Sequence, residues 1–146
     1  MRDLYQKILL DHYKNPRNSR RPHRVTHSCE GYNPLCGDRI IVYLTVEGGI
    51  VADAAFEASA CAVCTASASV MTEVVKGEPT DRLQAVFDTF RAIVRGETIS
   101  AAAAAPGDLA AFSGVSDYPV RVSCALLPWR TMLSALEGGD EAVTTE

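Results

Sequence analysis

The stretch IIVYLTVEGGIVADAAF (residues 40–56) carries the strongest fold signal in the sequence. Its first half is apolar and rich in β-branched residues, the segment 47–49 supplies a glycine-rich turn, and an apolar run resumes at Ile50. Two such runs around a short glycine turn predict an antiparallel hairpin. A weaker pattern over residues 24–28 predicts a third strand beside it.

Helical patterns lie on both sides of this hairpin. Apolar residues recur at helical spacing over residues 4–12, before Asn15-Pro16 ends the pattern. Further helices are predicted from Cys61 to Gly77, from Thr80 to Gly96 and from Cys124 to Leu136. Because the predicted strands are consecutive and are followed by helices, we expect an α+β fold, with a small antiparallel three-stranded sheet packed against several helices.

Composition limits the class of protein. The chain has 146 residues, of which 47% are hydrophobic and 22% charged, so we expect one domain over residues 1–139 and a frayed acidic tail over 140–146. A net charge of -4 argues against a nucleic-acid surface. No run approaches the roughly 20 apolar residues of a membrane-spanning helix, and the first residues lack a secretory apolar core. We therefore expect a cytoplasmic protein.

A basic stretch with two prolines follows the first predicted helix. Between residues 14 and 24 it holds four arginines and little apolar content. Such a stretch is typical of a solvated loop, and the alternative is a docking patch for an acidic partner surface.

The five cysteines indicate a functional site more than a disulfide framework, because their number is odd and a reducing compartment keeps thiols free. Cys36 is predicted in a turn, and Cys61 and Cys124 at helix starts, where the helix dipole favours a thiolate. Asp38 follows Cys36 after one glycine. Three thiolates and one carboxylate suit tetrahedral zinc, although spacing alone leaves open that these cysteines are small buried hydrophobes.

Two other cysteines and three histidines are assigned structural roles. Cys64 completes a C-x-x-C motif with Cys61, but two helical cysteines at this spacing are wider apart than a relaxed disulfide needs, and no βαβ context surrounds them. We interpret Cys64 as a packed neighbour, with an accessory ligand or a redox partner as alternatives, and Cys29 as structural. A lone histidine is more often hydrogen-bonded within the fold than a metal ligand, and this applies to the three histidines: His12, His23 and His27.

Several motifs resemble the U-type iron–sulfur assembly family: DHYKNPRN (11–18), NPLCGD (33–38) and CAVCTASAS (61–69), with Cys124 and Trp129 beyond them. Within that family the resemblance is closest to the SufU branch, which carries zinc and transfers sulfur. The segment 107–116 is similar to one that this branch has before its last cysteine, and Ser123 stands where the IscU branch has a histidine ligand. Pro128 departs from the pattern and is tolerable only near a helix start.

The resemblance implies a specific site. It implies zinc held by Cys36, Asp38, Cys61 and Cys124, with Cys36 as the sulfur acceptor. Arg121 corresponds to a basic residue that pairs with Asp38 when a partner rearranges the metal environment.

The resemblance also implies partners. The expected function is to accept persulfide sulfur from a cysteine desulfurase and pass it to downstream iron–sulfur scaffold proteins. One alternative is a scaffold that assembles a [2Fe–2S] cluster on the same ligands. Another is a thiol oxidoreductase that uses Cys61 and Cys64.

Overall fold

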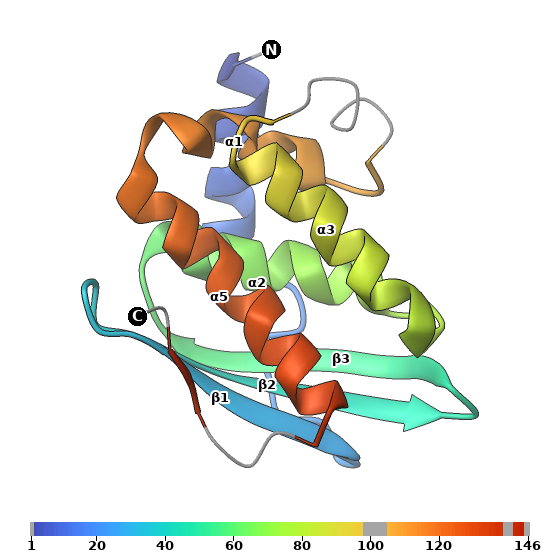
Figure 1. Ribbon diagram of the computed structural model, residues 1–146. Coiled ribbons are helices and arrows are strands. Elements are labelled where there is room, and N and C mark those ends of the chain that lie inside the picture. The colour runs from blue at the N-terminus through green and yellow to red at the C-terminus, as the bar shows by residue number, and fades with distance from the viewer. Residues whose placement is uncertain (1, 98–104, 139–141, 145–146) are drawn as a thin grey trace.

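The computed structural model describes residues 2–97, 105–138 and 142–144 of the chain. Helices cover one face of a sheet, so the α+β prediction is confirmed (Figure 1). The sheet has four strands in the order β3-β2-β1-β4, where three were predicted. Their bounds are His27–Asn33 for β1, Asp38–Glu47 for β2, Ile50–Ser59 for β3 and Val143–Thr144 for β4.

The predicted hairpin is the centre of this sheet. Strands β2 and β3 pair antiparallel, and the turn between them has positive φ at both Gly48 and Gly49, as a two-residue hairpin turn with matching twist requires. Strand β1 pairs antiparallel with β2, but it lies three residues later than predicted and continues to Asn33. The turn that holds Cys36 therefore joins β1 directly to β2, which is the first strand of the hairpin.

The fourth strand comes from the predicted tail. Val143 and Thr144 pair in parallel with β1, although the sequence indicated a frayed end at 140–146. The other tail residues, 140–141 and 145–146, lie outside the described part of the chain.

In the described part of the chain, four α-helices and two 3-10 segments cover one face of the sheet, with α2 and α5 packed directly on the strands and α1 and α3 packed outside them. Their bounds are Arg2–Lys14 for α1, Ala62–Val75 for α2, Thr80–Arg82 for η1, Leu83–Val94 for α3, Leu109–Asp117 for η2 and Pro119–Leu136 for α5. The small residues that follow Cys61 let α2 approach its neighbours closely, and Ser67 Oγ donates to the Ala125 carbonyl of α5 at 2.5 Å. Trp129 of α5 stacks on Phe90 of α3 with ring centroids 4.8 Å apart, which joins the outer helices to the same core.

The last helix differs from its prediction. It begins at Pro119 and not at Cys124, because proline is well tolerated at the first helical position. Cys124 therefore lies in the second turn of α5, and Pro128 lies in the helix interior. Since proline has no N–H, it cannot donate the usual helical hydrogen bond to the carbonyl of Cys124.

The basic stretch between residues 14 and 24 is a loop, as predicted. Three of its arginines pair with carboxylates of the same chain: Arg17 with Asp11, Arg20 with Asp53 and Arg24 with Glu47. These pairs favour the interpretation as a surface loop over a docking patch.

In the described part of the chain, no helix has the length and apolar character needed to cross a membrane.

Candidate metal centre

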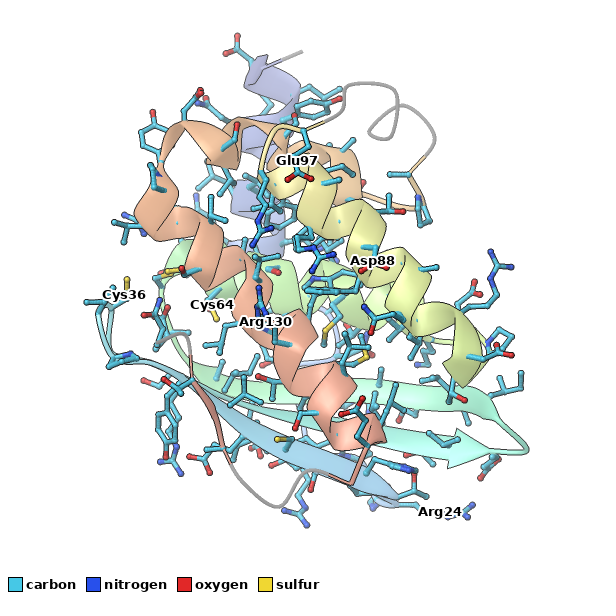
Figure 2. The ribbon with its side chains drawn as sticks, viewed as in Figure 1. Arg24, Cys36, Cys64, Asp88, Glu97 and Arg130 are labelled. Atoms are coloured by element: carbon cyan, nitrogen blue, oxygen red, sulfur yellow. The ribbon has the colours of Figure 1, made fainter. Side chains whose placement is uncertain are left out.

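Four predicted ligands lie together at one end of the sheet. Cys36 lies in the β1–β2 turn, where Gly37 has φ +69°, and Asp38 is the first residue of β2. Cys61 is the N-cap of α2, and Cys124 lies in α5. Figure 2 labels Cys36 on this turn, and Cys64 at the same end of the molecule. Residues 88 positions apart in the sequence thus meet at one site.

The distances between these side chains fit one metal ion. Cys36 Sγ and Cys124 Sγ are 3.5 Å apart, and both lie within 4.8 Å of an Asp38 carboxylate oxygen. Cys61 Sγ lies 3.5 Å from Asp38 Oδ2. Two sulfurs that each bind zinc at about 2.3 Å in a tetrahedral site would be about 3.8 Å apart. The Cys36–Cys124 spacing therefore needs only a small adjustment for a shared zinc, whereas Cys61 Sγ contacts Asp38 but lies outside the group whose ligand atoms are all within 4.8 Å of one another.

Hydrogen bonds from neighbouring N–H groups orient the proposed ligands. The Cys61 N–H donates to Asp38 Oδ1 at 2.8 Å, and the amide of Asn33 donates to Cys124 Sγ at 3.2 Å. The Cys64 N–H donates weakly to Cys61 Sγ at 3.5 Å. N–H donors of this kind stabilise the charged forms of thiolates and carboxylates. They also fix ligand orientation around a metal.

The burial of Asp38 is a second observation that favours a cation site. Its side chain is 2% exposed, and among the described residues no Lys, Arg or His forms an ion pair with it. A buried carboxylate is costly unless a positive charge compensates it. A divalent metal at this position would supply that charge.

The thiols of the centre are not all in the environment that the sequence predicts. Cys61 is at a helix N-terminus, as expected. Cys124 is fully buried inside α5, where burial and a hydrogen bond with Cys36 raise the pKa of its thiol. The helix dipole therefore does not favour the Cys124 thiolate, because the helix begins a turn earlier than predicted. A bound metal would oppose this shift, since a coordinated thiol is deprotonated.

Cys64 and Cys29 lie outside the ligand group. Cys64 is fully buried, and burial raises the pKa of its thiol, so it is a poor nucleophile and a poor partner for a redox pair with Cys61. This environment agrees with the interpretation as a packed neighbour. Cys29 is 6% exposed and lies within hydrogen-bonding distance of Ser134 Oγ, at 3.5 Å.

Asn33 is a site residue that the sequence analysis did not identify. It is 1% exposed, and its carbonyl oxygen accepts the Leu35 N–H while its amide donates to Cys124. One side chain thus holds the Cys36 turn and orients a ligand of α5. The available signal was its position three residues before Cys36, at the start of the NPLCGD motif.

Arg121 lies on the first turn of α5, three residues before Cys124. It is exposed and lines a cavity of about 560 Å³ together with Tyr5 and Tyr118. In this structure no ion pair joins its guanidinium to Asp38.

Two of the three histidines, His12 and His27, are hydrogen-bonded within the fold, as the sequence analysis expects. His12 is 1% exposed, with Nδ1 2.7 Å from Ser69 Oγ and Nε2 2.8 Å from Asp108 Oδ2. Glu73 approaches the same nitrogen at 3.9 Å. His27 Nδ1 lies 2.8 Å from Thr26 Oγ1, and His23 is exposed. None of the three lies in the thiol and carboxylate centre.

Two known proteins match nearly the whole chain. The chain is 36% identical over 143 residues to the zinc-dependent sulfurtransferase SufU of Bacillus subtilis (strain 168), covering 94% of each chain. It is 33% identical to the iron–sulfur cluster assembly scaffold protein IscU of Thermotoga maritima, covering 92% of this chain and 93% of the relative.

Solved structures share the fold. The N-terminal NifU-like protein of Brucella abortus has a TM-score of 0.80 and 29% identity, covering 94% of this chain and 95% of the other. A putative iron–sulfur cluster assembly scaffold protein for the SUF system (FiSufU) from Fervidobacterium islandicum AW-1 has a TM-score of 0.80 and 28% identity, covering 89% and 94%. Residues 4–125 match the family described as the NifU-like N-terminal domain. The chain therefore belongs to this family.

Proposed function

We propose that this protein is a zinc-dependent sulfur carrier, which accepts persulfide sulfur from a cysteine desulfurase and passes it on for iron–sulfur assembly. The observation that carries the proposal is the convergence of three cysteines and one buried aspartate from separate segments, with only Cys36 exposed among the three thiols. The similarity to a protein named as a zinc-dependent sulfurtransferase supports it.

The proposed ligands are Cys36, Asp38, Cys61 and Cys124. Three thiolates select zinc over hard cations such as magnesium or calcium. When bound there, zinc would keep these thiols deprotonated at neutral pH and protect them from oxidation. The protein's own contribution is the set of N–H donors from Asn33 and the Cys61 backbone, which hold Cys124 and Asp38 in place.

Cys36 is the proposed sulfur acceptor. It lies in an exposed turn, whereas Cys124 is fully buried and Cys61 caps a packed helix. The Cys36 thiolate attacks the outer sulfur of the desulfurase persulfide, the sulfur–sulfur bond breaks, and the desulfurase cysteine leaves as a thiolate. Cys36 is left as a persulfide. Arg121 assists by stabilising the charge of Asp38 when the ligand set rearranges.

The proposed setting follows from the thiol chemistry. Free thiols stay reduced in the cytoplasm, so we place the transfer there, with residues 1–139 acting as one domain. The sulfur then passes to downstream iron–sulfur scaffold proteins. The alternative function is a scaffold for a [2Fe–2S] cluster on the same four ligands, and the similarity to proteins named IscU supports it.

The test combines metal content with sulfur trapping. The purified protein should be colourless with one zinc per chain, and incubation with its cysteine desulfurase, cysteine and an alkylating agent should add sulfur mass to the Cys36 peptide. Cys36→Ser should abolish this mass, while Cys29→Ser serves as the control and retains it. Brown protein with visible absorbance would favour the scaffold, and sulfur found only on Cys61 or Cys124 would contradict the acceptor assignment.

A further inference from the structure

An apolar groove lies beside the metal centre. It consists of two neighbouring cavities of about 560 and 280 Å³, which share Gln6, Leu9 and Val63 as lining residues. We call it the α1–η2 groove and define it by Tyr5, Leu9, Val63, Val115, Tyr118 and Arg121. A groove of this size accommodates several side chains of a binding partner.

Exposed apolar side chains gather around this groove. Eight large hydrophobic residues are exposed in the described part of the chain. Three of these line the groove, namely Leu10 and Tyr13 of α1 and Tyr118 just before α5, and two more, Leu4 and Val120, lie on the same two helices. The remaining three are distributed over the sheet and the Cys36 turn. A concentration of apolar surface of this kind is typical of a protein-binding site.

The groove is contiguous with the candidate metal centre. Val63 is two residues from Cys61 on α2, and Arg121 is one helical turn from Cys124 on α5. A partner seated in the groove would therefore lie next to two of the proposed ligands. This position suits the protein that delivers sulfur to Cys36.

The walls and charge of the groove select the shape of its occupant. The walls are α1, α2, η2 and the start of α5, so the groove offers no strand edge to an extended peptide, whose backbone N–H and C=O groups would lack partners. A helix satisfies its own backbone and can insert an apolar face. Arg121 is the one cationic side chain that lines the groove, and no ion pair with a described residue involves it.

We propose that the α1–η2 groove binds an amphipathic helix of the cysteine desulfurase, with the apolar face of that helix in the groove and a carboxylate of the helix paired with Arg121. This inference rests on the proposed function and adds a docking surface to it. A guanidinium presents five N–H donors in a planar fork, so Arg121 can hold the partner's carboxylate on one edge and meet Asp38 with another.

Gly114 provides a way to block the groove without disturbing the fold. It lies in the wall formed by η2, and a Cβ atom at this position would meet no atom within 4 Å. Gly114→Trp should therefore fill the groove. Ala85→Trp is the matched control, because Ala85 is exposed on α3, which does not line the groove. Each variant is compared with the unaltered protein for zinc content, for binding to the desulfurase and for sulfur on Cys36.

We expect Gly114→Trp to keep its zinc and to accept sulfur on Cys36 from a small persulfide such as cysteine persulfide. Its apparent affinity for the desulfurase should fall at least tenfold, while Ala85→Trp binds like the unaltered protein. Equal binding by Gly114→Trp would overturn the groove inference and leave the proposed function standing. Absence of sulfur on Cys36 of the unaltered protein would instead overturn the proposed function.

A second measurement tests that the occupant is a helix. A photo-reactive phenylalanine analogue at Ser113, which lines the groove, should cross-link to one desulfurase peptide. That peptide should be helical in the desulfurase and contain an acidic residue. A cross-link to a strand or a loop, or no cross-link in a complex that binds with normal affinity, would contradict the inference.

Discussion

Among the described residues, two clusters each bring ligand atoms of three His, Cys, Asp or Glu side chains within 4.8 Å of one another. One is the centre formed by Cys36, Asp38 and Cys124, with Cys61 beside it. The other, which we call the His12 cluster, consists of His12, Glu73 and Asp108. The two differ in how far the protein itself satisfies their polar atoms.

The His12 cluster is complete without a metal. A neutral histidine has one donor and one acceptor, and Asp108 and Ser69 occupy both positions at 2.8 and 2.7 Å. Ser69 Oγ also accepts the Arg17 N–H at 2.8 Å. The hydrogen bonds of this cluster thus connect α1, α2 and the residue before η2.

The thiol centre lacks this completeness. The sulfur atoms of Cys36 and Cys124 are 3.5 Å apart, and the buried carboxylate of Asp38 has no basic partner among the described residues. Its strongest hydrogen bonds come from N–H donors, which favour negative charge. The residue types alone do not distinguish these two clusters, whereas the hydrogen bonds around them do, and those bonds favour the thiol centre as the candidate metal site.

The largest expected effect concerns zinc. Cys61→Ser or Cys124→Ser should lower zinc from one per chain to near zero and reduce thermal stability, because each removes a proposed ligand. His12→Ala should retain its zinc, because the His12 cluster is structural. Cys29→Ser, a buried cysteine outside the centre, is the control. Elemental analysis of the purified proteins measures their zinc content, and full zinc retention in a variant that carries both Cys61→Ser and Cys124→Ser would contradict this ligand set.

The second effect concerns stability. His12→Ala removes the ring that links Ser69 to Asp108 and leaves a cavity beside a buried hydroxyl, so the free energy of unfolding should fall by about 2 to 3 kcal/mol. His23→Ala, at an exposed histidine, should change it by less than about 0.5 kcal/mol. The free energies of unfolding of the two variants are measured by chemical denaturation of the zinc-loaded proteins. Equal stability of the two variants would contradict the role assigned to the His12 cluster.

The sequence predicts the elements better than the contacts between them. The β2–β3 hairpin has alternating apolar residues and a glycine turn, both local signals, and the helix after Cys61 ends where glycine predicts. The start of α5 was wrong by five residues, because Pro119 was not recognised as a first helical residue. The error placed Cys124 at a helix terminus that the structure assigns to Tyr118.

Long-range partners account for most of what the sequence did not predict. Strand β4 pairs through two residues, too few for a periodic signal. His12 and Asp108 lie 96 residues apart, and no local pattern links them. The four proposed ligands were named because a family resemblance supplied the pairing that spacing alone could not. Asn33 was missed because its role depends on the position of α5.

The third effect is smaller and concerns Cys64. Its thiol packs in the core beside the centre without joining the ligand group, so Cys64→Ser should keep zinc and sulfur transfer nearly intact. Stability should fall by about 1 kcal/mol, since the variant buries a hydroxyl in apolar surroundings. Cys64→Ala buries no polar group and serves as the control for that effect. Loss of zinc or of transfer in either variant would make Cys64 a functional thiol.

The smallest effect comes from a third polar cluster, which is partly exposed. Its contribution to stability can be compared with those of the other two clusters. Asp53 pairs with Arg20 at 2.8 Å and with Lys76 at 3.2 Å, and the hydrogen bond from Arg20 holds the pKa of Asp53 below its usual value. Asp53→Asn keeps the shape and an oxygen for the Ala54 N–H but loses the charge. At pH 7 the free energy of unfolding should fall by about 0.5 kcal/mol, as for other partly exposed pairs.

The pH dependence of this difference tests its origin. A carboxyl group whose pKa is lower in the folded than in the unfolded protein contributes stability above the unfolded value of about 3.9, and this contribution is lost as the pH falls through the folded value. The gap between the unaltered protein and Asp53→Asn should therefore be full at pH 7 and shrink toward zero as the pH falls through the lowered pKa of Asp53. Acid removes zinc from both proteins alike, so their difference isolates Asp53. A gap that stays constant down to pH 2.5 would show that packing, and not the ion pairs, stabilises this position.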